Sequence, residues 1–415
     1  MKLALLASMI FVVHAAGQLP HYTVTNLGTL GGTQSVGNTL NDIGWAMGAA
    51  NLAGDTTEHA TLWTNGVTVD LGTLGGPNSN VAWPVKNVHG KIAGVSNTST
   101  PDPLGESFSC TAFLPATGDT CLGFRWENNK IFALPTLGGN NGIAAGVNNS
   151  GQVVGWAETA VHDSTCVAPQ VLQFEAVLYG PGKQQIQPLP PYPRDPDSAA
   201  TAINDNEQIV GISGICSNAI GGYSAEHALL WEHGTVTNIG SLGGVGWNTP
   251  VAINNQGQVA GFSDLPGDVS GGVLTYNFHA FFWTKAGGIQ DLGTLPGDNI
   301  SEATGMNNLG QVVGVSFPSS HAFLWQNGVM TDLNSLIAPT SQFLLISTGD
   351  INDSGEITGQ ACVVSGGVCT TELVAFLAVP KSGGDTAEVA PTNVVVPNNV
   401  RQLVRQQLGM GRFAH

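Results

Sequence analysis

The sequence contains little charge, and basic residues are the scarcer of its two charged classes. Only 10% of its 415 residues are charged, with 12 Lys and Arg against 29 Asp and Glu, and the formal net charge is −17. Nucleic acids bind basic surfaces through their phosphates. We therefore expect no nucleic-acid partner.

Sequence patterns of metal and nucleophile sites are absent as well. The chain has no C-x-x-C pair, no H-x-H or H-E-x-x-H spacing and no G-x-S-x-G turn. We therefore expect no metal, no cofactor and no catalytic residue that can be named. The loop carboxylates of Asp264 with Asp268, or of Asp298 with Glu302, could bind calcium. Neither pair has a full ligand loop, so solvated surface charge is the preferred interpretation.

Long apolar runs are also missing. The run over residues 3–13 follows Lys2 and precedes small residues at 15–17, a pattern that predicts a secretory signal peptide at 1–17. No later run reaches the ~20 apolar residues of a transmembrane helix. We expect a monomeric secreted protein, either extracellular or periplasmic.

Glycine, by contrast, is abundant, and it belongs to an internal repeat. The 56 Gly residues suit tight turns and disfavour helices. A repeat unit occurs seven times, with copies 45 to 61 residues apart. Each copy contains an anchor Asn, at Asn41, Asn87, Asn148, Asn204, Asn254, Asn307 and Asn352.

Each copy predicts four short strands. Gly follows the anchor after three residues in six copies, which indicates a tight turn, and again after seven residues in all copies, which indicates a close backbone approach. A third apolar stretch ends in an aromatic residue in six copies, and a fourth follows closely. Four-stranded repeats of this length are typical of propeller blades. A linear array of β modules is the alternative.

The two ends of the repeat region predict a closed ring. The last copy stops after its third strand at 375–377, whereas residues 22–28 match the fourth strand at 67–72 before any first strand has appeared. We therefore predict an all-β protein, a seven-bladed β-propeller over 18–380 whose last four-stranded blade is closed by the N-terminal strand. Residues 381–415 are expected to form a flexible tail. Weak helical periodicity at 400–408 indicates a possible short helix in this tail. The alternative to a flexible tail is a short basic anchor that binds an acidic partner.

Recurring tripeptides carry a family resemblance. His279-Ala280-Phe281 and His321-Ala322-Phe323, together with Asp-Leu-Gly-Thr-Leu at 70–74 and 291–295, resemble the HAF-repeat family of extracellular bacterial repeat proteins. Leu122, Glu175 and Val374 stand where His is expected. The resemblance implies export and repetition, and it brings no substrate, cofactor or catalytic residue. His59, His227, His279 and His321 share one repeat position on different blades, so we interpret them as structural.

Six cysteines in an exported chain predict disulfides. Cys110 with Cys121, and Cys362 with Cys369, each flank a short segment between the second and third strands of one copy. Cys166 and Cys216 remain as partners by elimination. They occupy the same loop in consecutive copies, which adjacent blades would bring together.

Function is expected on the face that carries the long loops, because variable loops on a rigid scaffold are where binding usually occurs. Trp83 and Trp247 lie near the innermost strands, where exposed rings could stack on a sugar or another flat apolar surface. Local gap filling is the preferred interpretation for both. We expect a non-catalytic extracellular binding or surface-interaction module with a carbohydrate or protein ligand. The alternative is an extracellular propeller enzyme acting on polysaccharide as a glycosidase or lyase.

Overall fold

The structure is a computed structural model, which describes residues 19–106, 108–180, 186–217, 221–270, 273–275, 277–338, 341–381 and 394–407. The predicted signal peptide at 1–17 lies outside the described residues. So do residues 382–393 and 408–415 of the predicted tail.

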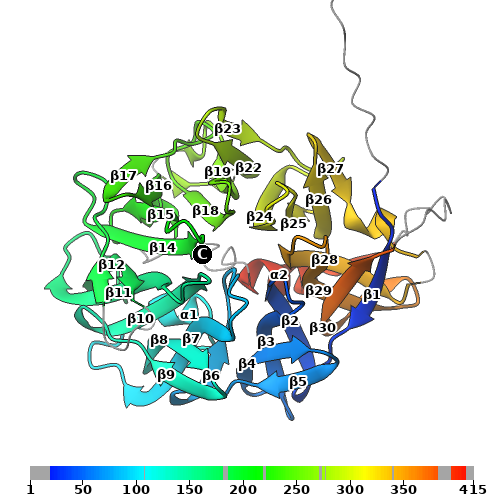
Figure 1. Ribbon diagram of the computed structural model, residues 1–415, viewed down its shortest axis with the longest axis horizontal. Helices are drawn as coiled ribbons and strands as arrows, with labels where there is room; N and C mark the ends of the chain where they lie inside the picture. Colours follow the sequence, from blue (N-terminus) through cyan, green and yellow to red (C-terminus); the bar gives the residue numbers. More distant parts are fainter. Residues whose placement is uncertain are drawn as a thin grey trace, which may run out of the picture.

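Seven four-stranded antiparallel sheets stand in a ring, so the predicted seven-bladed β-propeller is confirmed (Figure 1). From the innermost strand outwards, blade 1 is β2 (Gly31–Leu40), β3 (Ala46–Leu52), β4 (Glu58–Thr64) and β5 (Val67–Asp70). Blade 2 is β6 (Gly75–Asn80), β7 (Lys91–Pro101), β8 (Asp119–Glu127) and β9 (Lys130–Ala133). Blade 3 is β10 (Gly138–Val147), β11 (Val153–His162), β12 (Leu172–Tyr179) and β13 (Ile186–Pro188). Blade 4 is β14 (Asp197–Ile203), β15 (Ile209–Gly214), β16 (His227–Glu232) and β17 (Thr235–Asn238).

The second half of the ring repeats the pattern. Blade 5 is β18 (Asn248–Ile253), β19 (Val259–Asp264), β22 (Phe278–Thr284) and β23 (Gly288–Asp291), with the small hairpin β20 (Val269–Ser270) and β21 (Val273–Leu274) in its long loop. Blade 6 is β24 (Ile300–Met306), β25 (Val312–Phe317), β26 (His321–Gln326) and β27 (Val329–Asp332). Blade 7 is β28 (Phe343–Ile351), β29 (Ile357–Ser365), β30 (Val368–Pro380) and β1 (Tyr22–Asn26). Helices are short: α1 (Phe108–Thr111), α2 (Asn398–Gln407), η1 (Gly222–Ser224) and η2 (Leu333–Leu336).

The N-terminal strand closes the ring as predicted. β1 pairs antiparallel with β30, from Tyr22 opposite Pro380 to Asn26 opposite Phe376. Tyr22 is buried, and it packs in the apolar cluster between blades 6 and 7. The first and last strands of the propeller therefore share one sheet.

Two repeated residue types explain how the strands pack. A Cβ atom on Gly48 or Gly155, each seven residues after an anchor Asn, would collide with a carbonyl oxygen of the inner strand, so the predicted close backbone approach is confirmed. The Ala of the H-A-F position faces the next blade. The Ala60 and Ala280 N–H groups donate to the hydroxyls of Ser79 and Ser301, at 2.9 and 2.8 Å.

The anchor asparagines form a continuous belt around the ring. Each Nδ2 donates to the backbone carbonyl of the next anchor, over 2.7–3.2 Å, and Asn352 returns the belt to Asn41. Each Oδ1 accepts N–H groups of its own turn, as Asn41 does from Ile43 and Trp45. Such bonds from an Asn side chain to its own turn are typical of tight turns. The hydrogen bonds between anchors of neighbouring blades could not be predicted from the residue pattern of a single copy.

The predicted disulfides are all present: Cys110–Cys121, Cys166–Cys216 and Cys362–Cys369. Cys166–Cys216 joins the loops of blades 3 and 4, where the Val167 N–H also donates to the Ser217 carbonyl. The described residues contain no helix long and apolar enough to cross a membrane.

Removing the inter-blade disulfide should destabilise the protein more than removing a local one. Cys166 and Cys216 are 50 residues apart, whereas Cys362 and Cys369 are seven residues apart. Loop-closure entropy then predicts losses of about 4 and about 2.5 kcal/mol in the free energy of unfolding. Urea unfolding of C166S/C216S and C362S/C369S measures both. Equal losses would contradict the entropic argument.

The C-terminal helix packs on the propeller. Val400 and Val404 of α2 are fully buried, and the Arg405 guanidinium lies 5.4 Å from the centroid of the Phe317 ring. Just before α2, the Val395 N–H donates to Gly367, and the Val395 carbonyl accepts from Cys369. Residues 394–407 of the expected flexible tail are thus a packed part of the fold.

Candidate functional site

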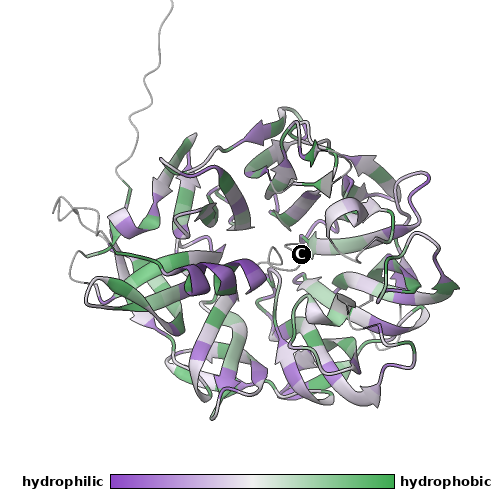
Figure 2. Ribbon diagram, turned by 180° about the vertical axis from the view of Figure 1, so that it is seen from behind, coloured by the Kyte–Doolittle hydropathy of each residue, from purple (hydrophilic) through white to green (hydrophobic). Residues whose placement is uncertain are grey.

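The ring has two unlike faces, because alternate connections of an antiparallel chain lie at opposite ends of its strands. The anchor turns and the turns between third and fourth strands share one face, here called the turn face. The loops after the second strands and the connections between blades share the other, the loop face. Helix α2 lies on the loop face, in front of the ring in Figure 2.

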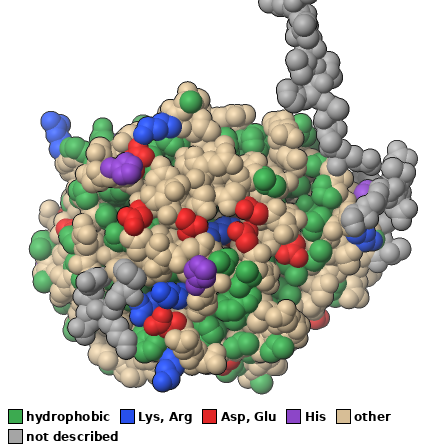
Figure 3. All heavy atoms as spheres, viewed as in Figure 1, with side chains coloured by type: hydrophobic (Ala, Val, Ile, Leu, Met, Phe, Trp, Pro, Cys, Tyr) green, Lys and Arg blue, Asp and Glu red, His purple; other side chains and the backbone are tan. Residues whose placement is uncertain are grey.

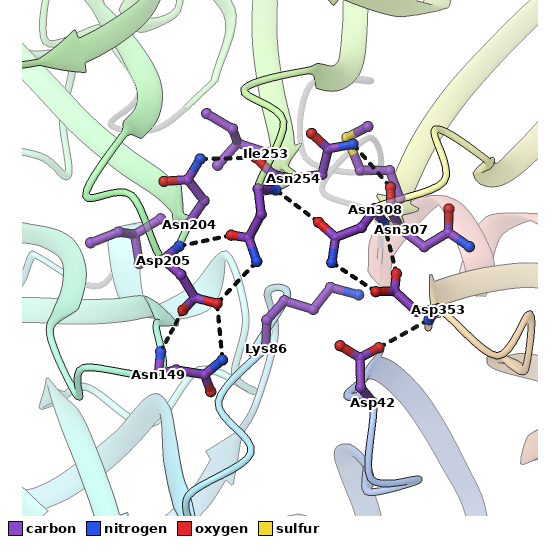
Figure 4. A pocket seen from close by; sticks show the side chains of 13 residues that line it. Asp42, Lys86, Asn149, Asn204, Asp205, Ile253, Asn254, Asn307, Asn308 and Asp353 are labelled. Atoms are coloured by element: carbon purple, nitrogen blue, oxygen red, sulfur yellow. Dashed lines mark hydrogen bonds between the residues drawn. The ribbon is translucent and has the colours of Figure 1, made fainter.

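The centre of the turn face is a polar rosette formed by the side chains that follow six of the anchors. They are Asp42, Asn149, Asp205, Asn255, Asn308 and Asp353, and each accepts an N–H of the preceding blade over 2.8–2.9 Å (Figure 4). The Lys86 ammonium lies beside them, 2.7 Å from Asp350 Oδ2. Figure 3 shows acidic side chains around a basic one at this centre.

The rosette leaves a cavity of only about 30 Å³, room for a water or two. Its polar groups largely bond one another. Nowhere in the described part of the chain do three His, Cys, Asp or Glu side chains lie where they could hold a metal ion. The rosette therefore ties the inner turns together and offers little space to a ligand.

The centre of the loop face is filled by an apolar cluster that includes both predicted tryptophans and α2. Trp247 is 5% exposed, its ring centroid lies 5.4 Å from that of Phe262, and its Nε1 donates to Thr249. It presents no free face for stacking, so the gap-filling alternative describes it. Trp83 is partly buried with its ring edge-on to Phe113, at 6.0 Å between centroids. A binding role for Trp83 stays a prediction.

The repeated histidines form pairs with aspartates across the two outer strands. His59, His279 and His321 bond through Nδ1 to Asp70, Asp291 and Asp332, at 2.8–2.9 Å. Burial raises the pKa of Asp70 and Asp291, but hydrogen bonds from the His and from a Gly N–H outweigh it and hold both pKa values below their usual range. In blade 4, His227 instead bonds Asp195, at 2.7 Å. These pairs lie on separate blades, in keeping with a structural role.

Blade 2 departs furthest from this pattern. Leu122 stands at the His position and Ala133 at the Asp position, opposite Phe124 in the sheet. Blade 3 carries Glu175 and Pro188, and blade 7 carries Val374 and Asn26. In blade 2, therefore, neither the His position nor the Asp position holds a polar side chain.

A groove of about 470 Å³ opens at that departure, on the loop face between blades 2 and 3. We call it the Leu122 groove. Its lining comes from the end of β7 and the loop after it, the start of β8, the connection from β9 to β10 and the start of β10: Thr98, Thr100, Pro101, Pro103, Thr120, Leu122, Leu134, Pro135, Thr136, Gly139 and Asn140. None of these side chains is charged. The sequence shows that Leu122 departs from the repeat. It does not show the groove, because the segments that line the groove are separated along the chain.

Comparisons with known proteins bear on the fold only. Neither a family model nor a curated protein matches the chain. Among solved structures, it is similar to the Pyrococcus horikoshii acylaminoacyl peptidase (TM-score 0.44, 10% identity, 84% of this chain and 51% of that one). It is also similar to Porphyromonas gingivalis dipeptidyl peptidase 4 (TM-score 0.33, 9% identity, 77% of this chain and 49% of that one). The chain spans about half the length of each.

Proposed function

We propose that the protein is an exported, non-catalytic binding module that holds an uncharged ligand in the Leu122 groove. A volume of about 470 Å³ is that of a small-molecule or short-segment site. Prolines and leucines supply apolar surface, while threonine hydroxyls and the Asn140 amide supply hydrogen bonds. An uncharged lining in a chain of net charge −17 favours a neutral carbohydrate or peptide segment.

The position of the groove carries this proposal. Six blades keep at least one polar side chain of the outer-strand pair, and the groove opens at the blade that keeps neither. A departure that creates a ligand-sized space on the loop face is therefore more informative than any repeated residue.

Export is part of the same proposal. Three disulfides support an oxidising compartment, either outside the cell or in the periplasm. A binding module needs exposed loops on a rigid scaffold, and the three disulfides hold loops of the loop face in place.

Restoring the repeat should abolish binding and preserve the fold. In the double variant L122H/A133D, a His–Asp pair like those of blades 1, 5 and 6 would occupy the groove. We expect affinity for the best hit from glycan and peptide arrays to fall about tenfold or more, with an unchanged melting temperature. Isothermal titration calorimetry measures the affinity.

The matched control places the same pair in blade 7 as V374H/N26D, which should bind like the wild type. Equal affinity of L122H/A133D and the wild type would place the ligand elsewhere. Turnover on a panel of glycosidase and lyase substrates would replace the proposal with the polysaccharide-enzyme alternative.

A further inference from the structure

Two buried glutamates lie close to the segments that line the Leu122 groove. Glu106 precedes α1 in the long loop of blade 2 and is 0% exposed, and Glu158 in the middle of β11 is 2% exposed. None of the ion pairs between described residues includes either of them. Buried carboxylates without a cation must find hydrogen bonds or a proton.

Glu158 accepts hydrogen bonds from one segment that lines the groove, and Asn141 links it to a second. Its Oε2 accepts the N–H groups of Asn140 and Asn141, at 3.1 and 2.8 Å. The Asn141 side chain lies 3.3 Å from Glu158 Oε1 and donates to Asp102 Oδ2 at 2.7 Å. Asn140 lines the groove from the blade 3 side, and Pro101 and Pro103, which flank Asp102, line it from blade 2. The bridge Asp102–Asn141–Glu158 therefore ties the two segments together.

Glu106 joins the same network from blade 2. Its Oε1 accepts the N–H groups of Val171 and Leu172. The Gln170 Nε2 lies 3.4 Å from Glu106 Oε1 and 3.1 Å from Glu158 Oε1, so one amide serves both carboxyl groups. Glu106 Oε2 and Gln170 Oε1 have no hydrogen-bond partner among the described residues. The charged groups that face Glu158 are thus Glu106 and, beyond Asn141, Asp102.

We propose that this network is a pH-sensitive clamp on the Leu122 groove, closed while Glu158 holds a proton and loosened when the proton leaves. The effect of the clamp on a ligand rests on the proposed function. The uncharged ligand is then held firmly in mildly acidic surroundings and released above neutral pH. A neutral Glu158 can still accept the N–H groups of Asn140 and Asn141 through Oε2, and it adds no charge beside Glu106. An ionised Glu158 places a second negative charge beside Glu106, with no cation to offset it.

The direction of the effect follows from linkage. Burial, and secondly the charge of Glu106, raise the pKa of Glu158 from 4.5 to about 7 in the closed state. An opened clamp exposes Glu158 to water, where its pKa returns towards 4.5. The closed state therefore binds the proton more tightly, and closure is lost progressively as pH rises from about 4.5 to about 7.

Hydrogen exchange of the ligand-free protein tests the clamp directly. Between pH 5.5 and 8.5, that pKa displacement predicts an about 30-fold increase in local opening. Protection factors of peptides covering 100–106 and 137–142, corrected for intrinsic exchange, should fall accordingly. In E158Q, whose neutral amide cannot ionise, they should not depend on pH. E302Q, a buried glutamate changed in blade 6, should behave like the wild type at these peptides.

Wild-type protection that is flat with pH overturns the clamp, even if E158Q fails to fold. E106Q gives a second test, because removing its charge lowers the pKa of Glu158 and should shrink the pH effect. Failure of the binding proposal is separate, since L122H/A133D would then bind the array hit normally whatever the exchange data show.

Discussion

Deletion of residues 22–28 should lower the melting temperature by roughly 10 °C or more and promote aggregation. The deletion removes β1, whose five residues pair with β30 and whose Tyr22 is buried between blades 6 and 7. It leaves β30 as an unpaired edge in blade 7, a template for association with other chains. Differential scanning calorimetry and light scattering measure the two effects.

A synthetic peptide covering 19–28 provides the control. Added in excess, it should restore part of the lost stability by filling the empty edge, whereas a scrambled peptide should not. If the shortened protein unfolds at the wild-type temperature, β1 does not close the ring in solution.

Repetition in the sequence was sufficient to predict the architecture because each copy carries the same pattern of turn and strand residues. Asn41 and its six equivalents each begin a tight turn, and Gly48 and its equivalents each allow a close backbone approach. Consecutive copies place equivalent loops side by side, which is why Cys166 and Cys216 could be paired from their positions alone.

Contacts between copies were harder to predict. The Nδ2 bond from Asn352 to Asn41 spans 311 residues, and no pattern within a copy indicates it. The sequence left both stacking and gap filling open for Trp247, because it does not show that Phe262 and Phe278 pack against the Trp247 ring. Leu122 was recognisable as a departure, but the groove depends on where residues 98–103 and 134–140 meet in space.

The structure corrects the interpretation of Asp264, Asp268 and Glu302 as solvated surface charge, because all three side chains are buried. Buried acids make the stability of the whole ring depend on pH. Burial raises the pKa of Glu302 to about 8, and burial together with Asp268 raises that of Asp264 to about 8. Hydrogen bonds from the backbone at Trp247 and Asn277 lower the pKa of Asp264 without offsetting its burial, and Glu302 Oε2 has no hydrogen-bond partner among the described residues. The folded state binds these protons more tightly than the unfolded state does. Each group therefore costs no stability below about pH 4, and its cost grows as pH rises towards about 8.

We therefore expect the free energy of unfolding to fall between pH 5.5 and pH 8.5, by on the order of 2–3 kcal/mol for each such acid. E302Q, whose neutral amide has no charge to bury, should stabilise the protein more at pH 8.5 than at pH 5.5, by that amount. E372Q, which alters an exposed glutamate in β30, is the matched control and should follow the wild type at both pH values. Urea unfolding at the two pH values measures the difference. A wild-type protein that is more stable at pH 8.5 than at pH 5.5 would show that Asp264 and Glu302 are solvated or paired with a cation in solution, so that burial no longer governs their ionisation.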